Sequence, residues 1–292
     1  MSKFNDLLII SNNRETYETK RIIEELDKEI IQYNILSWNE ITIPFNHYPK
    51  VCLIRSVPDF QKEFSLPYLL TFIEHLEQNG SICIPSSHDL YQADKASCLL
   101  IAKKNGILIP DFIIGEDLQQ LSKFIKKHKK ILYKPMIGSK GKGIKILSND
   151  IDKELEIFSQ INSIIYLQEF IENKKYDIRT IFIDNKMICQ FIRENEKDFR
   201  YNISLGGKGH SPDDYIKMDP NLDFFLTESK KIGEILSNKM GLKIFGMDTI
   251  PSLKNKLYFL EINPILGFYG AEKATNVNIA KEIVQVIIKI LK

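Results

Sequence analysis

The first ninety residues alternate short apolar runs with segments whose apolar residues recur at helical spacing. Helices are predicted over residues 15–27 and 66–79, and Gly80 ends the second helix. The apolar runs that predict β-strands are Leu7–Ile10, Ile31–Leu36, Val51–Arg55 and Ile82–Ile84. Strands that alternate with helices in this way are typical of a small parallel sheet covered by helices.

The middle of the chain places a glycine-rich loop between two extended segments. The predicted elements are helices over 94–105, 118–128 and 151–162 and strands over 112–115, 131–135, 144–147 and 166–171. A Walker A loop needs Lys and then Ser or Thr directly after its last glycine, and Ile144 and Lys145 break that pattern. We interpret the loop as a lid that closes over phosphates through Ser139, Gly141, Gly143 and its lysines, with a mobile, solubilising turn as the alternative.

Two hairpins dominate the last third of the chain. The first is predicted from strands over 179–183 and 186–192 around Asp184 and Asn185. The second, called the 242–263 hairpin below, has strands over 242–250 and 257–263 joined by a polar turn. A helix over 223–240 precedes the second hairpin, and an amphipathic helix ends the sequence.

The 242–263 hairpin gathers three oxygen-bearing side chains. The period of two in its second strand places four residues on one face: Leu257, Phe259, Glu261 and Asn263. Pairing across the turn puts Asp248 opposite or diagonal to Glu261. Two carboxylates and an amide suit Mg²⁺, with Mn²⁺ as a substitute, whereas the alternative is a hairpin whose acids point into water.

Composition and charge exclude several classes of protein. The chain has 292 residues, 43% of them hydrophobic and 27% charged, with a net charge of +2. This mild charge gives no reason to expect nucleic acid as a partner. Four cysteines without CxxC spacing favour a reducing cytosol. No apolar segment approaches 18 residues and no signal peptide is recognisable, so we expect a cytoplasmic protein without a membrane partner.

Several further residues complete an ATP site that needs no Walker A loop. Lys134, at the end of the strand before the glycine loop, can neutralise phosphate oxygens. Glu169 can accept a hydrogen bond from the adenine amino group, and Asp177 from a ribose hydroxyl. The backbone amides around Phe170 and Ile171 can bind adenine at a strand edge.

Two arginines of the N-terminal block are candidate anion contacts. Arg14 lies in the segment that follows the first strand, and Arg55 ends the third. Ligands of open α/β sheets bind at the carboxyl ends of the strands, which is where both arginines are expected. Each could equally be the partner of a surface ion pair.

The motifs of the last two thirds of the chain resemble, in order, those of the ATP-grasp superfamily and of its RimK-like amino-acid ligases. The matching stretches are DKASCLLIAKKNGILIP, YKPMIGSKGKGI, LQEFI, DIRTIFI, FRYNISLGG, GMD and EINPILGFYGAEKATNVNIA. The resemblance implies an α/β (α+β) ATP-grasp fold in three parts. These are a pre-grasp domain over 1–90, a central subdomain with the lid over 91–170, and a C-terminal subdomain with the magnesium site over 171–292.

The resemblance also implies an activity. A carboxylate–amine ligase of this kind splits ATP into ADP and phosphate, forms an acyl phosphate, and lets an amine attack it to give an amide. The subfamily suggests L-glutamate as the amino acid, and a carboxylate of a small molecule, peptide or protein C-terminus as its acceptor. ATP and two Mg²⁺ ions are the expected cofactors. The oligomeric state stays open, a homo-oligomer included.

Matching positions carry the family's site residues onto this chain. The nucleotide contacts would be Lys95, Lys134, Glu169, Phe170, Asp177, Arg200 and Asn202, and the metal ligands Asp248, Glu261 and Asn263. Arg179 and Arg200 are the candidates for stabilising the acyl phosphate and the oxyanion, a role worth about 3 kcal/mol of barrier. Relatives usually read Asn-x-x-Pro-Gly after the metal ligands, but here Pro264 follows Asn263 directly. The acceptor pocket is therefore expected to differ.

Two other functions were weighed against the ligase. A nucleotide-binding scaffold without catalysis is expected to lack a metal ligand or a phosphate contact, yet the metal ligands Asp248, Glu261 and Asn263 are all present, as are Lys134 and Arg200. A small-molecule kinase would need the same nucleotide site. Product analysis separates the three functions, because only the ligase forms an amide.

Overall fold

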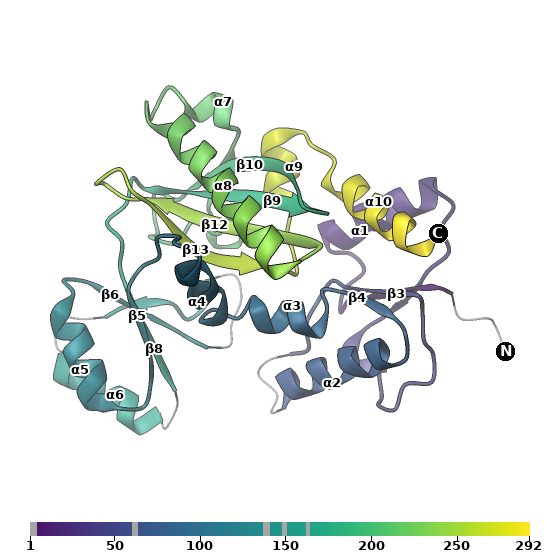
Figure 1. Cartoon of the computed structure of the whole chain (residues 1–292), viewed down its shortest axis with the longest axis horizontal. Helices are drawn as coiled ribbons and strands as arrows, with labels where there is room; N and C mark the ends of the chain where they lie inside the picture. Colours follow the sequence, from purple (N-terminus) through teal and green to yellow (C-terminus); the bar gives the residue numbers. More distant parts are fainter. Residues whose placement is uncertain (1–4, 60–63, 137–140, 148–150, 162–163) are drawn as a thin grey trace.

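The computed structural model describes residues 5–59, 64–136, 141–147, 151–161 and 164–292. The strands of these residues form three sheets, with helices packed around and between them (Figure 1). The mixed α/β fold predicted from the sequence is confirmed. No helix in the described part of the chain is long and apolar enough to cross a membrane.

The N-terminal sheet is entirely parallel, as predicted. Its strands, in the order β2-β1-β3-β4, are β1 (Leu7–Ile10), β2 (Asn34–Leu36), β3 (Val51–Ile54) and β4 (Ile82–Ile84). Both faces are covered, because Leu7 and Ile9 pack in a core with helix α1 (Tyr17–Lys28), whereas Leu8 and Ile10 pack in another with α2 (Ser65–Gln78). This two-sided burial explains why the strands are continuously apolar.

One helix near the end of this unit was not predicted. It is α3 (Ser87–Gln92), and it begins with a capping box in which Ser86 and Asp89 exchange hydrogen bonds. The expected domain boundary at 90/91 falls inside α3. The boundaries at 90/91 and 170/171 remain predictions, although the chain does change sheet between β4 and β5 and between β8 and β9.

The middle sheet is antiparallel, in the order β5-β8-β6-β7. Its strands are β5 (Phe112–Gly115), β6 (Ile131–Lys134), β7 (Lys145–Ile146) and β8 (Ile165–Glu169). Helix α5 (Leu118–Lys127) packs against one face through Leu121 and Ile125, and α6 (Ile151–Ile161) lies beside it (Figure 1). The other face is turned toward the third sheet.

The third sheet is also antiparallel, in the order β11-β10-β9-β12-β13. Its strands are β9 (Tyr176–Ile183), β10 (Lys186–Glu194), β11 (Lys208–His210), β12 (Ile244–Pro251) and β13 (Leu257–Asn263). Helix α8 (Leu222–Met240) covers one face (Figure 1). Gly233 permits this close approach, since a Cβ there would lie 2.1 Å from the Phe182 ring.

The remaining helices complete the chain at the two joints between sheets. Helix α4 (Ser97–Lys104) packs near β13 through Cys98 and Leu99, and α7 (Pro212–Tyr215) precedes α8. Helices α9 (Tyr269–Thr275) and α10 (Ile279–Leu291) share one core with α1, the N-terminal sheet and the end of β9. The N-terminal unit is therefore packed directly against the C-terminal third.

A buried carboxylate ties these two units together. One oxygen of Glu272 accepts from the Tyr17 hydroxyl at 2.8 Å and from Arg21 Nε at 3.1 Å. The other accepts from the backbone amides of Ile279 and Ala280 at 2.8 and 3.1 Å. Burial, together with the neighbouring Glu272, raises the pKa of Tyr17 to about 12. All four hydrogen-bond donors therefore share the single carboxylate of Glu272.

We expect Glu272→Gln to lower the free energy of unfolding by about 3 kcal/mol, because it leaves buried donors facing an uncharged amide. Urea denaturation followed by circular dichroism measures the change. The matched control is Glu24→Gln, since Glu24 pairs with the same Arg21 at 2.6 Å but is 55% exposed. That variant should change stability by less than about 1 kcal/mol. Equal losses in the two variants would contradict this role for Glu272.

Candidate functional site

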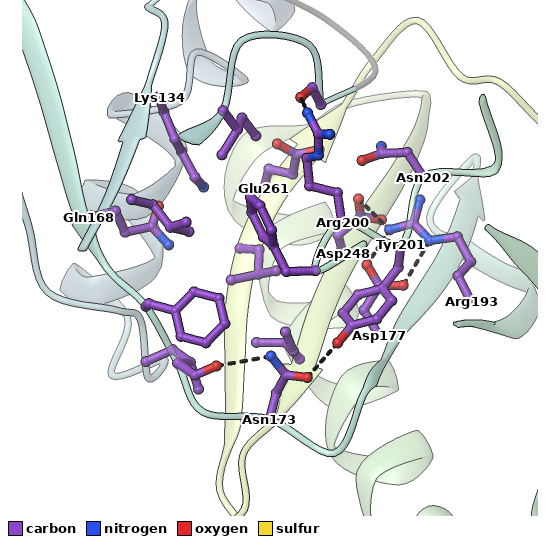
Figure 2. Close-up of a pocket in the computed structure, with 18 of the residues that line it drawn as sticks. Lys134, Gln168, Asn173, Asp177, Arg193, Arg200, Tyr201, Asn202, Asp248 and Glu261 are labelled. Carbon is purple, nitrogen blue, oxygen red and sulfur yellow. Dashed lines mark hydrogen bonds and ion pairs between the residues drawn. The ribbon is translucent and has the colours of Figure 1, made fainter. Parts of the chain in front are cut away.

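A cleft lies between the middle and third sheets and contains most of the polar residues predicted from the sequence (Figure 2). The space between its walls, open solvent included, is about 730 Å³. Its polar lining includes Lys134, Gln168, Glu169, Asn173, Asp177, Arg193, Arg200, Asn202, Asp248 and Glu261. The walls also include apolar side chains such as Leu132, Ile144 and Phe170.

The 242–263 hairpin places its two acids as predicted, but for a partly different reason. Asp248 on β12 lies directly opposite Glu261 on β13. The register then shifts, so that Thr249 pairs with Phe259 and Leu260 is the additional residue of a β-bulge. The prediction that Leu257, Phe259, Glu261 and Asn263 share one face is therefore wrong. The bulge keeps Phe259 in the core under α8 and turns Glu261 toward the cleft.

Asp248 belongs to a buried cluster of alternating charges on the cleft side of the third sheet. Arg179, directly opposite on β9, donates from Nε and Nη2 to its two oxygens, both at 2.6 Å. Arg193 on β10 lies 2.8 Å from Asp248 and donates at 2.8 and 2.5 Å to Asp177. The two arginines therefore neutralise the two aspartates, and Figure 2 shows the Arg193 contacts.

The cluster shifts the pKa values of the two carboxylates in opposite directions. Burial opposes ionisation of Asp248, but the guanidinium groups of Arg179 and Arg193 hold its pKa well below the usual range. Burial raises the pKa of Asp177 to about 6, against the attraction of Arg193. Asp248 is thus ionised at neutral pH and each of its oxygens already accepts a hydrogen bond.

Arg193 was not predicted as a site residue. A plain two-residue hairpin around Asp184 and Asn185 would pair Asp177 with Ile192. Instead, the register shifts between Met187 and Cys189, and Arg193 comes opposite Asp177. The only signal in the sequence is a positive residue near the end of the second strand, and the bulge that aligns it is a tertiary feature.

Of the two lysines expected at the nucleotide, Lys134 lines the cleft, whereas Lys95 is not among its lining residues. Lys134, at the end of β6, is 8% exposed and lines the cleft, where Figure 2 shows it opposite Glu261. Burial lowers the pKa of Lys134, and Glu261 partly offsets that effect. Burial also lowers the pKa of Lys95, whose Nζ donates to the carbonyl of Pro135. Glu261 is therefore the acidic counterpart of both lysines.

Arg200 and Asn202 meet the described end of the glycine-rich loop. Arg200 donates to the carbonyl of Gly141 at 3.0 Å and to both oxygens of Asp198 at 2.9 and 2.6 Å. Gly141 has φ +71°, and a Cβ there would lie 2.6 Å from Asn202 Oδ1. Gly143 likewise has a positive φ, of +77°. Ser139 lies outside the described residues.

The end of β8 differs from the prediction for adenine. The Phe170 amide donates to the carbonyl of Lys130 at 3.0 Å, so this donor is already used. The Glu169 carboxylate accepts from the Asp111 amide at 3.3 Å and lies 3.8 Å from His128 Nδ1. Both residues line the cleft, and their contacts to adenine stay a prediction.

The remaining predicted residues are Arg179 and Asn263. Arg179 donates two hydrogen bonds to Asp248, as Arg200 does to Asp198, and its role at an acyl phosphate stays a prediction. Asn263 Nδ2 donates to Glu261 Oε1 at 3.2 Å, which keeps the amide and the carboxylate side by side as predicted. Asn263 stands next to the cleft through this contact.

These residues fit a divalent cation held by oxygen ligands next to an anionic ligand. Glu261 faces the cleft with Asn263 beside it and Asp248 on the next strand. Carboxylate and amide oxygens are the ligands that Mg²⁺ prefers. Lys134 and Arg200 supply positive charge around the same space, as a polyphosphate requires.

Comparisons with known proteins agree with this geometry. The RimK-like ATP-grasp domain matches residues 92–287. A probable alpha-L-glutamate ligase of Legionella pneumophila (strain Corby) is 29% identical over 230 residues, which cover 76% of this chain and 72% of the relative. The tetrahydromethanopterin:alpha-L-glutamate ligase of Methanocaldococcus jannaschii is 23% identical over 286 residues, covering 93% and 94%.

Solved structures of ATP-grasp ligases have a similar fold. A structure of the ATP-grasp ligase PsnB complexed with a minimal precursor superposes with a TM-score of 0.73 at 17% identity, covering 99% of this chain and 100% of PsnB. PsnB has also been solved with its minimal precursor, Mg and ADP. The family match spans the middle and third sheets and every residue of the cleft, and on that basis the chain belongs to the RimK-like ATP-grasp family of ADP-forming ligases.

Proposed function

We propose that this ligase joins the amine of L-glutamate to a carboxylate of an acceptor, through an acyl phosphate. The observation that supports it best is the convergence of Lys134, Arg200 and Glu261 on one cleft. A buried lysine and an arginine opposite a carboxylate suit a triphosphate with its cation. The names of the relatives support glutamate as the amino acid.

The cation site in this proposal is Glu261, Asn263 and Asp248. Glu261 is the principal ligand, since among these three it faces the cleft without an arginine bonded to it. Asp248 would contribute a lone pair that Arg179 and Arg193 leave unused, because a carboxylate accepts about four hydrogen bonds. When bound, Mg²⁺ would neutralise charge on the phosphate oxygens.

The chain's own residues then have distinct tasks. Lys134 would hold phosphate oxygens from the end of β6 and Lys95 from the turn before α4, and Gly143 of the loop lies beside Pro135. Arg200 is placed to stabilise the acyl phosphate, because it is anchored to Asp198 and to the Gly141 carbonyl at the cleft. Arg179 acts in this scheme by fixing Asp248, and Asp177 and Arg193 extend the same support. Positioning supplies much of the rate when reactants are held in this way.

The direct test is a coupled measurement of ADP release and product mass. Purified protein, ATP, Mg²⁺ and L-glutamate are incubated with a panel of carboxylates that includes small dicarboxylates and peptides with free C-termini. One ADP per new amide, and loss of both after EDTA treatment, is the expected result. A stable phosphorylated product would support a kinase instead, and ATP binding without turnover on any acceptor would favour a scaffold.

A further inference from the structure

Arg55 stands where the parallel N-terminal sheet is open to a ligand. It follows β3, and its amide donates to the carbonyl of Ile10 at the end of β1, at 2.8 Å. In the order β2-β1-β3-β4, β2 lies on one side of β1 and β3 lies on the other side, so the direction of the chain across the sheet reverses at β1. The carboxyl ends of β1 and β3 therefore flank the switch point at which such sheets bind ligands.

The guanidinium of Arg55 is short of partners. Its Nη2 donates to the carbonyl of Leu266 at 2.6 Å, and its Cζ lies 5.9 Å from the centre of the Phe268 ring. Nε is buried and has no hydrogen-bond partner. Burial lowers the pKa of Arg55 to about 10, and Glu18 is the acid that opposes this shift. The side chain remains a cation at neutral pH.

Glu18 is not bonded to Arg55, and one oxygen of its carboxylate is already used. Glu18 Oε1 accepts from the backbone amides of Phe268 and Tyr269, at 3.1 and 3.2 Å. Within the described ranges, Arg55 forms no ion pair with any acid. Arg14, the other arginine expected to contact an anion, is instead exposed and bonded to the carbonyl of Ile35. The two arginines were equal candidates in the sequence, but in the structure Arg14 is exposed, whereas Arg55 has a buried nitrogen without a partner.

A buried cation without a counter-ion is costly, and it persists in proteins where a bound group neutralises it. Arg55 as a whole residue keeps some contact with solvent. The side chain offers Nε and Nη2 as a fork, which is the arrangement that binds a carboxylate through two hydrogen bonds. A carboxylate is therefore the chemically matched occupant.

A single residue, Leu266, lies between Arg55 and Arg179 of the charge cluster. Leu266, whose carbonyl Arg55 contacts, follows the 242–263 hairpin. A Cβ on Gly246 would lie 2.8 Å from Leu266 Cδ1 and 3.7 Å from Arg179 Cδ. Leu266 thus separates Arg55 from the charge cluster. This is also the segment in which Pro264 replaces the family's usual spacing after Asn263.

We propose that Arg55 binds a carboxylate of the substrate that is not itself activated, so that the enzyme acts on a compound with at least two carboxylates. This inference rests on the proposed ligase function and adds to it the chemical class of one substrate. The reacting carboxylate points toward the cleft, and the second is held by Arg55 between β3 and the 264–268 segment.

The single tryptophan offers a direct reporter of this site. Trp38 Nε1 donates to the carbonyl of Ser56, the residue next to Arg55, at 3.0 Å. Glutarate, L-glutamate and inorganic phosphate are each titrated into the protein with Mg²⁺ and a non-hydrolysable ATP analogue, and Trp38 fluorescence is recorded. We expect a saturable change with a dicarboxylate, at least a 10-fold higher Kd for it in Arg55→Met, and partial recovery in Arg55→Lys.

The controls separate binding from folding. Arg14→Met should leave the Kd unchanged, and Arg55→Met should melt at or above the wild-type temperature because an unpaired buried charge is gone.

An unchanged Kd in Arg55→Met, no saturable change with either dicarboxylate, or binding of phosphate alone would each overturn the proposal. Amide formation with the same KM in Arg55→Met would do so while leaving the ligase intact. Dicarboxylate binding through Arg55 without any amide product would instead refute the proposed function alone.

Discussion

Replacing Glu261 with glutamine is expected to lower the rate of ATP-dependent amide formation by about 10² to 10³-fold. Glutamine keeps the shape of the side chain and its contact with Asn263, but it removes an acid whose charge acts on both Lys134 and Lys95. The variant loses the charge that holds a divalent cation in the cleft. Steady-state ADP release and product mass measure the effect.

The fold should not change in this variant, because Glu261 makes no ion pair within the described part of the chain. A melting temperature within a few degrees of wild type is therefore part of the expected result. The control is Glu172→Gln, which alters an exposed acid on a neighbouring loop and should keep full activity. Wild-type turnover in Glu261→Gln would remove the cation site from the proposed function.

Replacing Arg193 with methionine should destabilise the protein by about 3 to 5 kcal/mol at pH 7.5, since it strands a buried carboxylate. Arg193 is 2% exposed and neutralises Asp177 through two hydrogen bonds. Asp248 still keeps Arg179 in the variant, so the loss falls mainly on Asp177. Denaturant unfolding measures the free energy at each pH.

The pH dependence of Arg193→Met follows from the pKa of Asp177. Burial already raises that pKa to about 6 in the folded protein, and loss of Arg193 raises it further. The folded state then binds a proton more tightly than the unfolded state, so the penalty is complete above the folded pKa and shrinks as the pH falls toward 4. We expect the gap between variant and wild type to be smaller at pH 5 than at pH 7.5.

A second substitution tests the cause. In Arg193→Met combined with Asp177→Asn, the stranded charge is removed, and much of the lost stability should return. Arg193→Lys keeps a positive charge but not the two-pronged geometry, and should fall between wild type and Arg193→Met. A double variant as unstable as Arg193→Met would show that packing, rather than charge, is what Arg193 contributes.

Local patterns predicted much of this molecule correctly. Alternation of apolar runs and helical segments predicted the parallel N-terminal sheet, and the turn residues Asp184 and Asn185 predicted the β9–β10 hairpin. These features depend on neighbours within a few residues, which the sequence displays directly. The pairing of Asp248 with Glu261 belongs to the same class, because both strands meet at one short turn.

The contacts that set the chemistry could not be predicted in the same way. Bulges at two strands decide which residues face the cleft, and a one-residue shift moves a side chain to the opposite face of a sheet. The sequence offered Asp177, Arg179 and Asp248 as separate contacts to ligands. In the structure they neutralise one another, together with Arg193.

Short-range order and residue identity were enough to predict most of the elements, the family motifs and the types of side chain available for a nucleotide and a cation. Which charges are balanced and which are left over became clear from the three-dimensional contacts. Charge balance depends on burial and on partners far apart in the chain. Arg179 pairs with the acid Asp248 on β12. Arg55, in contrast, lies beside the backbone carbonyl of Leu266 and has no acidic hydrogen-bond partner among the described residues.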